Sequence, residues 1–304
     1  MNSEEQQQLQ SSLKSADTEE WLDLKFYRPL GLHWALLFKR LGVTPNAITI
    51  ASIFLGMGAG VMFYFDSLPL TLVGIVLLVW ANTYDSADGQ LARLTGQKSE
   101  LGRILDGMSG DVWFISIYLA IVLRLTPTWS LWIWLLAAAA GYSHSTQAAI
   151  ADYYRNIHLF FLKGKQGSEL DRADGQEELY RSLSWHDNFV KKLFLFFYKG
   201  YTARQESVTP QFQRFFSLLN QKYSDGVAPE DIRQTFRQKS LPLMKYTNIL
   251  SFNTRAIVLC LSLLASMPWI YFVFELTVLN GLLIYMVRRH ERLSDEMYRI
   301  IGGE

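Results

Sequence analysis

The chain has few cysteines to form crosslinks and little excess positive charge to bind nucleic acid. It contains a single cysteine, Cys260, so an internal disulfide is excluded. Its 29 Lys and Arg residues nearly balance 28 Asp and Glu residues, and the formal net charge of +1 gives no reason to expect a nucleic-acid partner. The first twenty residues are polar and rich in Gln, Ser and Glu, so we expect no cleavable signal peptide there.

Long apolar runs are what the sequence does contain. Half of its 304 residues are hydrophobic, and they gather into stretches separated by one strongly polar block. Because about 20 apolar residues let a helix cross a bilayer, the pattern predicts an all-α membrane protein with six transmembrane helices. The expected spans are 46–65, 70–91, 103–125, 129–152, 248–266 and 269–287.

The expected organisation has six parts. They are a disordered tail at 1–20, an interfacial amphipathic helix at 21–42, spans one to four with the functional motif at 43–155, a helical cytoplasmic insertion at 156–245, spans five and six at 246–290, and a cytoplasmic tail at 291–304. The segments 21–41 and 186–203 both mix aromatic residues with Lys and Arg, which is typical of helices on a membrane surface. Helix packing with a solvated basic face explains the same composition equally well.

Three aspartates stand at the ends of two expected spans. Asp85 and Asp88 lie one helical turn apart on span two, and Asp106 lies at the start of span three. A carboxylate at the centre of a membrane helix costs about 2.5–3.5 kcal/mol, and less toward the interface. An all-carboxylate cluster suits a hard cation such as Mg²⁺ or Mn²⁺. The sequence therefore predicts a metal site.

The distribution of basic residues predicts on which side of the membrane these aspartates lie. The turns at 66–69 and 266–269 contain no Lys or Arg, and Arg124 is the only basic residue at that end of the helices. By the positive-inside rule, both termini and the aspartates are expected to be cytoplasmic, in a bacterial inner membrane or an equivalent.

The aspartates and their neighbours resemble the signature of the CDP-alcohol phosphatidyltransferase family, D-x-x-D-G-x-x-A-R, eight residues, then G-x-x-x-D-x-x-x-D. With the eight-residue gap kept, the chain matches at Asp85, Asp88, Gly89, Ala92, Arg93, Gly102 and Asp106. The segment 43–49, with Pro45 and Asn46, also resembles the start of the family's first span. The resemblance covers roughly 40–155 and 245–290 and leaves out the insertion.

The resemblance implies an integral membrane enzyme of phospholipid biosynthesis. In it, Asp85, Asp88 and Asp106 would hold a binuclear Mg²⁺ or Mn²⁺ centre that grips the CDP pyrophosphate. The residues assigned to the CDP pocket are Gly89, Ala92, Arg93, Gly102, Pro45 and Asn46. The family resemblance also implies a homodimer.

One departure from the family pattern concerns the fourth aspartate. The family has it at position 110, where this chain has Gly110, and Asp111 follows one residue later. A shift of one residue turns a side chain by about 100° on a regular helix. Because the segment 107–110 is rich in glycine, a π-bulge would bring Asp111 back as the fourth ligand, acting with Asp106 in catalysis. The alternatives are that His144 is the base, or that activity is lost.

Polar residues on spans four and five predict where the acceptor binds. Arg155 ends the polar side of span four, and Arg255 lies about two turns inside span five. We expect both to line an acceptor pocket with His144, although a buried core histidine is the favoured interpretation of His144.

The implied reaction moves a phosphatidyl group from CDP-diacylglycerol to a polar alcohol, such as inositol phosphate, glycerol phosphate or serine, and releases CMP. The expected partners are the CDP-activated substrate, the acceptor alcohol and membrane lipids. One alternative transfers a phospho-alcohol from a small CDP-alcohol to a lipid hydroxyl of diacylglycerol or a ceramide. Another is an inactive scaffold or an ion-binding transporter. The intact aspartates argue against a scaffold, and their interfacial position argues against transport.

Overall fold

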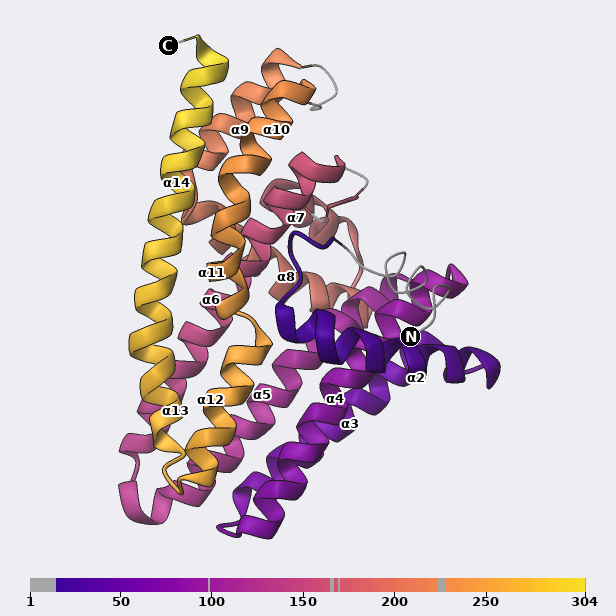
Figure 1. Cartoon of the computed structure of the whole chain (residues 1–304), viewed down its shortest axis with the longest axis vertical. Helices are drawn as coiled ribbons and strands as arrows, with labels where there is room; N and C mark the ends of the chain where they lie inside the picture. The colour runs from indigo at the N-terminus through magenta and orange to yellow at the C-terminus, as the bar shows by residue number, and fades with distance from the viewer. Residues whose placement is uncertain (1–14, 98, 165–166, 169, 224–227, 304) are drawn as a thin grey trace. The chain divides into compact units, whose positions relative to one another are not determined.

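The computed structural model describes residues 15–97, 99–164, 167–168, 170–223 and 228–303. Every regular element within these ranges is helical, so the expected all-α class is confirmed (Figure 1). Residues 1–14, which belong to the expected disordered tail, lie outside the described ranges.

Five helical stretches of the described chain are long and apolar enough to cross a membrane. They are Pro45–Tyr64, Leu68–Thr95, Gly102–Trp129, Glu230–Leu264 and Trp269–Gly302. They include the expected spans one, two, three, five and six. The expected fourth span falls in α6 (Trp132–Lys163), which is 32 residues long but is not among the five. The polar run Ser143–Gln147 lowers its hydropathy, so length alone does not identify it as a span.

The first three spans form helices with clear boundaries. In α3 (Pro45–Tyr64), the Thr44 side chain accepts a hydrogen bond from the Ala47 amide at 3.4 Å, and Pro45 occupies the first turn. The next helix, α4 (Leu68–Thr95), ends at Gly96, whose φ of 68° is a left-handed conformation that glycine adopts without strain. In α5 (Glu100–Trp129), the Ser99 hydroxyl accepts from the Gly102 amide at 2.9 Å.

Glycine residues, which have no side chain, let α3 approach its two neighbours, α4 and α5, closely. A Cβ at Gly60 would lie 2.9 Å from the Ser116 carbonyl carbon of α5, and one at Gly56 would lie 2.1 Å from the Trp113 ring. On the α4 side, a Cβ at Gly74 would lie 2.5 Å from the Phe63 ring. Small residues of this kind are common where membrane helices meet, because they allow backbones to pack closely.

The segment expected to lie at the membrane interface consists of a π-helical turn, η1 (Asp23–Tyr27), followed by α2 (Arg28–Arg40). Helix α2 packs along α4: Ala35 contacts a buried cluster with Ala87 and Leu91, and Gln90 donates to the Arg28 carbonyl at 3.0 Å. One face of this amphipathic helix is therefore used for packing against α4.

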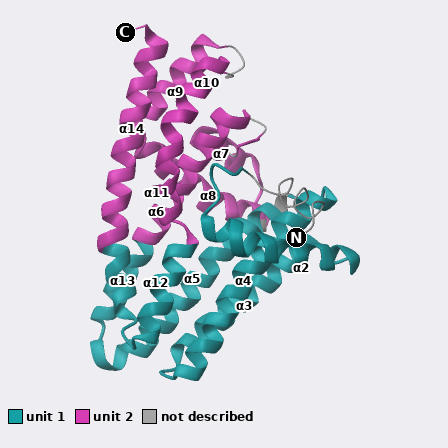
Figure 2. Cartoon of the chain, in the orientation of Figure 1, with its two compact units in different colours: residues 1–142, 253–276 teal, residues 143–252, 277–304 magenta. Residues whose placement is uncertain are grey.

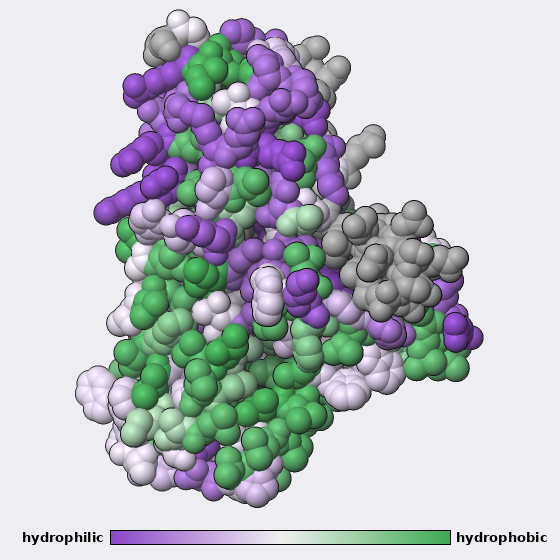
Figure 3. Space-filling model, in the orientation of Figure 1, coloured by the Kyte–Doolittle hydropathy of each residue, from purple (hydrophilic) through white to green (hydrophobic). Residues whose placement is uncertain are grey.

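The chain divides into two compact units (Figure 2). Unit 1 comprises residues 1–142 and 253–276, and it contains most of α12 (Phe252–Leu264) and α13 (Trp269–Phe274). Its surface in Figure 3 is largely hydrophobic over α3, α4, α12 and α13, as a lipid-facing surface should be.

Unit 2 comprises residues 143–252 and 277–304, and the expected insertion within it is helical. Its elements are α7 (Ala173–Ser182), α8 (Phe189–Ser207), α9 (Pro210–Lys222), α10 (Glu230–Ser240), η3 (Leu241–Leu243) and α11 (Met244–Ile249). The π-helical turn η4 (Glu275–Leu279) leads into α14 (Asn280–Gly302), which packs against α9 and buries Leu293 and Met297. Residues 291–302, expected as a tail, therefore continue a packed helix.

Candidate metal centre

Two helices bring the three predicted aspartates together. Asp85 and Asp88 project from the same face of α4, and Asp106 comes from the first turns of α5. Their carboxylates each place an oxygen within 4.8 Å of the others. Asp88 is 2% exposed, Asp85 is half-buried and Asp106 is exposed, so the cluster opens toward solvent on the Asp106 side.

A bound cation would relieve the mutual repulsion of these carboxylates. Two negative charges 4.8 Å apart repel by about 3–4 kcal/mol at an effective dielectric constant of about 20. Three converging carboxylate oxygens form the donor set that hard divalent cations prefer. The cluster is therefore consistent with a metal site.

Two hydroxyl groups hold the carboxylates in place. The Thr49 hydroxyl of α3 hydrogen-bonds Asp88, and Thr49 itself is 2% exposed. The Ser109 hydroxyl of α5, also 2% exposed, donates to Asp85 at 2.7 Å. Such outer contacts orient metal ligands and tune their affinity. The sequence analysis did not identify either residue, although Ser109 lies one turn from Asp106 and Thr49 one turn from Pro45.

The remaining motif residues surround the aspartates. The Arg93 guanidinium folds back over Gly89, where an added Cβ would lie 3.4 Å from the Arg93 Nη2. Its Nε and Nη2 are buried without a hydrogen-bond partner. A Cβ at Gly102 would lie 2.5 Å from the Asn46 Oδ1, so the absence of a side chain there lets Asn46 reach α5. Ala92 follows Gly89 by less than a turn on α4.

The expected π-bulge before Asp111 is not present. Helix α5 is α-helical from Glu100 to Trp129, because the glycines at 107 and 110 fit a regular helix without strain. Asp111 is exposed, and its carboxylate is not part of the three-aspartate cluster. A Cβ at Gly110 would meet nothing within 4 Å, so the position of the family's fourth aspartate is open space.

The residues expected to bind the acceptor lie in different units. In unit 2, Arg155 donates from Nη2 to the Ser251 hydroxyl at 2.7 Å, its Nε is buried without a partner, and His144 is 8% exposed. In unit 1, Arg255 is 1% exposed and forms an ion pair with Glu275. This pairing places the Arg255 guanidinium inside the unit rather than at an open surface.

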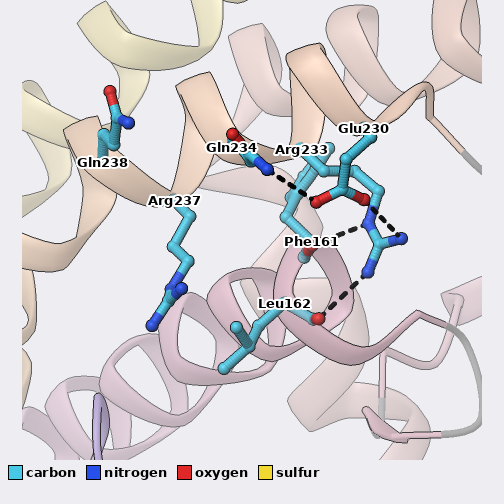
Figure 4. Close-up of a pocket in the computed structure, with 7 residues that line it drawn as sticks. All are labelled: Phe161, Leu162, Glu230, Arg233, Gln234, Arg237 and Gln238. Carbon is cyan, nitrogen blue, oxygen red and sulfur yellow. Dashed lines mark hydrogen bonds and ion pairs between the residues drawn. The ribbon is translucent and has the colours of Figure 1, made fainter.

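A cavity of about 210 Å³ lies elsewhere, in unit 2 (Figure 4). It is lined by Phe161, Leu162, Glu230, Arg233, Gln234, Arg237 and Gln238. Arg233 donates at 3.0 Å to each of the Phe161 and Leu162 carbonyls at the end of α6 and pairs with Glu230. Arg233 thus supplies hydrogen bonds to carbonyls at the end of α6. The residues that line the cavity include none of the predicted site residues.

Comparison with known proteins agrees with the geometry. A family model described as CDP-alcohol phosphatidyltransferase matches residues 42–157, which contain all three clustered aspartates. The fold and the carboxylate cluster agree with this match, so residues 42–157 are similar to the CDP-alcohol phosphatidyltransferase family.

The chain is similar to two curated proteins over part of its length. The chain is 29% identical over 135 residues to the bifunctional IPC transferase and DIPP synthase of Aquifex aeolicus, an alignment of 42% of this chain and 31% of the relative. It is 37% identical over 89 residues to the archaetidylinositol phosphate synthase of Pyrococcus horikoshii, covering 29% of this chain and 46% of the relative. The chain thus matches less than half the length of either relative.

Proposed function

We propose that this protein transfers a phosphatidyl group from CDP-diacylglycerol to a polar alcohol and releases CMP, with an inositol phosphate as the first acceptor to test. The three-aspartate cluster on α4 and α5 carries this proposal. The Pyrococcus relative, named an archaetidylinositol phosphate synthase, supports the choice of acceptor.

The reaction joins the acceptor to the lipid-bearing phosphorus. The acceptor oxygen bonds to this phosphorus, the bond from it to the CMP oxygen breaks, and the hydroxyl proton passes to a carboxylate. Asp85, Asp88 and Asp106 would hold Mg²⁺ or Mn²⁺, and the bound metal would neutralise pyrophosphate charge and stabilise the leaving oxygen. Arg93 supplies two buried nitrogens that lack a hydrogen-bond partner and can donate to a phosphate oxygen.

Two carboxylates of α5 are candidates for taking the proton. Asp106 is the exposed member of the cluster, whereas Asp111 lies outside it on a regular helix. We therefore assign the proton to Asp106. Arg155 and His144 remain proposed acceptor-binding residues, and Arg255 is left out of the pocket because of its ion pair with Glu275.

The orientation of the protein is also a proposal. The distribution of Lys and Arg favours a cytoplasmic cluster and cytoplasmic termini. A nucleotide and a polar alcohol then reach the carboxylates from water while acyl chains stay in the bilayer. The homodimer implied by the family resemblance is a further prediction.

The test is CMP release by the purified protein in lipid vesicles with Mg²⁺ or Mn²⁺. One set offers CDP-diacylglycerol with inositol phosphate, glycerol phosphate or serine. The other offers CDP-choline, CDP-ethanolamine or CDP-inositol with diacylglycerol or ceramide. Asp85→Asn should abolish release, and Asp111→Asn, a matched carboxylate change on α5, should keep it. Turnover only in the second set would reverse donor and acceptor, and equal release by Asp85→Asn would refute the site.

A further inference from the structure

Helix α8 carries an exposed apolar stripe although it is not among the five candidate spans of the described chain. Its members Phe189, Leu193, Phe196 and Phe197 are 58%, 39%, 49% and 64% exposed. Their spacing of four, seven and eight residues from the first places them on one helical face. Four large apolar side chains in one row are more than scattered surface residues, and they mark a contact surface.

The opposite face of α8 fixes the helix to its own unit. Leu195 and Thr202 are 3% and 1% exposed. Gln205 donates to the Ala149 carbonyl of α6 at 2.8 Å. Because this face is buried within unit 2, the apolar stripe points out of the unit and is not available for packing inside it.

Cations and a tryptophan border the stripe. Helix α8 contains Lys191, Lys192, Lys199 and Arg204 and one carboxylate of its own, Glu206, and Lys199 also pairs with Glu177 of α7 at 2.9 Å. Lys199 lies 3.9 Å from the centroid of the Tyr180 ring, and Lys192 lies 5.5 Å from that of Trp185, itself 43% exposed. Exposed phenylalanines beside lysines and a tryptophan form the pattern of a helix that lies in a membrane interface.

We propose that the stripe of α8 lies in the headgroup region of an anionic leaflet of the bilayer that the spans cross. The phenylalanines enter the acyl boundary, and the lysines remain at the level of the lipid phosphates. Charge favours lipid over a second copy of the chain. A two-fold contact through this stripe would bring the same lysines together from both copies.

The single cysteine makes this proposal testable. In a Cys260→Ser background, Phe197→Cys is labelled with an environment-sensitive fluorophore, and Glu178→Cys, an exposed polar position of α7, is the matched control. The intact protein is reconstituted in phosphatidylcholine vesicles with and without phosphatidylglycerol. The label at 197 should emit at shorter wavelength and be quenched several-fold more by brominated lipid than the label at 178, with stronger quenching in anionic vesicles.

Three results would overturn the proposal. Equal quenching at 197 and 178 would place the stripe in water. A short-wavelength emission at 197 that depends on protein concentration and ignores brominated lipid would place a second copy on the stripe. Equal quenching in neutral and anionic vesicles would remove the role of the lysines.

Discussion

The buried ion pair of unit 1 gives the sharpest mutational prediction. Arg255 of α12 and Glu275 of η4 are 1% and 0% exposed, and the Tyr271 hydroxyl donates to Glu275 at 2.6 Å. Removing one member of such a pair leaves a buried charge without its partner, which costs about 3–5 kcal/mol. Arg255→Met and Glu275→Gln should each destabilise the fold by that amount, roughly a 100-fold to several-thousand-fold shift in the unfolding equilibrium.

Equilibrium unfolding in mixed micelles, followed by circular dichroism as the fraction of denaturing detergent rises, measures these changes. Leu261→Ala on the same helix is the control, since Leu261 is 61% exposed. Replacing Arg255 and Glu275 together by methionine should be less harmful than either single change, because no charge is then left buried. A fully stable Arg255→Met protein with a raised KM for the acceptor would refute this reasoning and return Arg255 to the acceptor pocket.

Two further predictions concern α3. Thr49→Val should weaken Mn²⁺ binding about 10–100-fold, because the Asp88 carboxylate loses its hydrogen bond, whereas Thr49→Ser should keep the wild-type affinity. Titration of the protein with Mn²⁺, followed by electron paramagnetic resonance, measures both affinities. An unchanged affinity in the valine variant would contradict this prediction. Gly60→Val should lower folding stability by about 1–3 kcal/mol, because its Cβ would meet the Ser116 backbone. Gly110→Ala, whose Cβ would meet nothing within 4 Å, should change stability by no more than about 1 kcal/mol. Thermal melts of the two variants measure this difference.

Much of the fold and the centre of the site follow from local patterns. Apolar runs near the length of a bilayer crossing predicted five of the candidate spans. Helical periodicity placed Asp85 and Asp88 on one face of one helix, and the family resemblance implied that Asp106 joins them, as it does.

What the sequence did not predict depends on contacts between distant residues. The hydrogen bond of Thr49 to Asp88 joins positions 39 residues apart, and the pairing of Arg255 with Glu275 joins two helices. The π-bulge expected before Asp111 is absent, since a glycine-rich segment permits a bulge without requiring one. The π-helical turns are instead at Asp23–Tyr27 and Glu275–Leu279, where no local signal predicted them.

Because of the length of α4, the thickness of the membrane should affect how deeply its aspartates lie in the bilayer. Asp85 lies 17 residues after Leu68, or about 26 Å along the helix axis, against a hydrocarbon core of about 30 Å. With Leu68 held at the opposite boundary, lipids with longer acyl chains draw the carboxylates into hydrocarbon, and shorter ones leave them in the headgroup layer. We therefore expect the mismatch between helix and bilayer to change how far the aspartates lie from water, and with it the affinity of the candidate metal site for a cation.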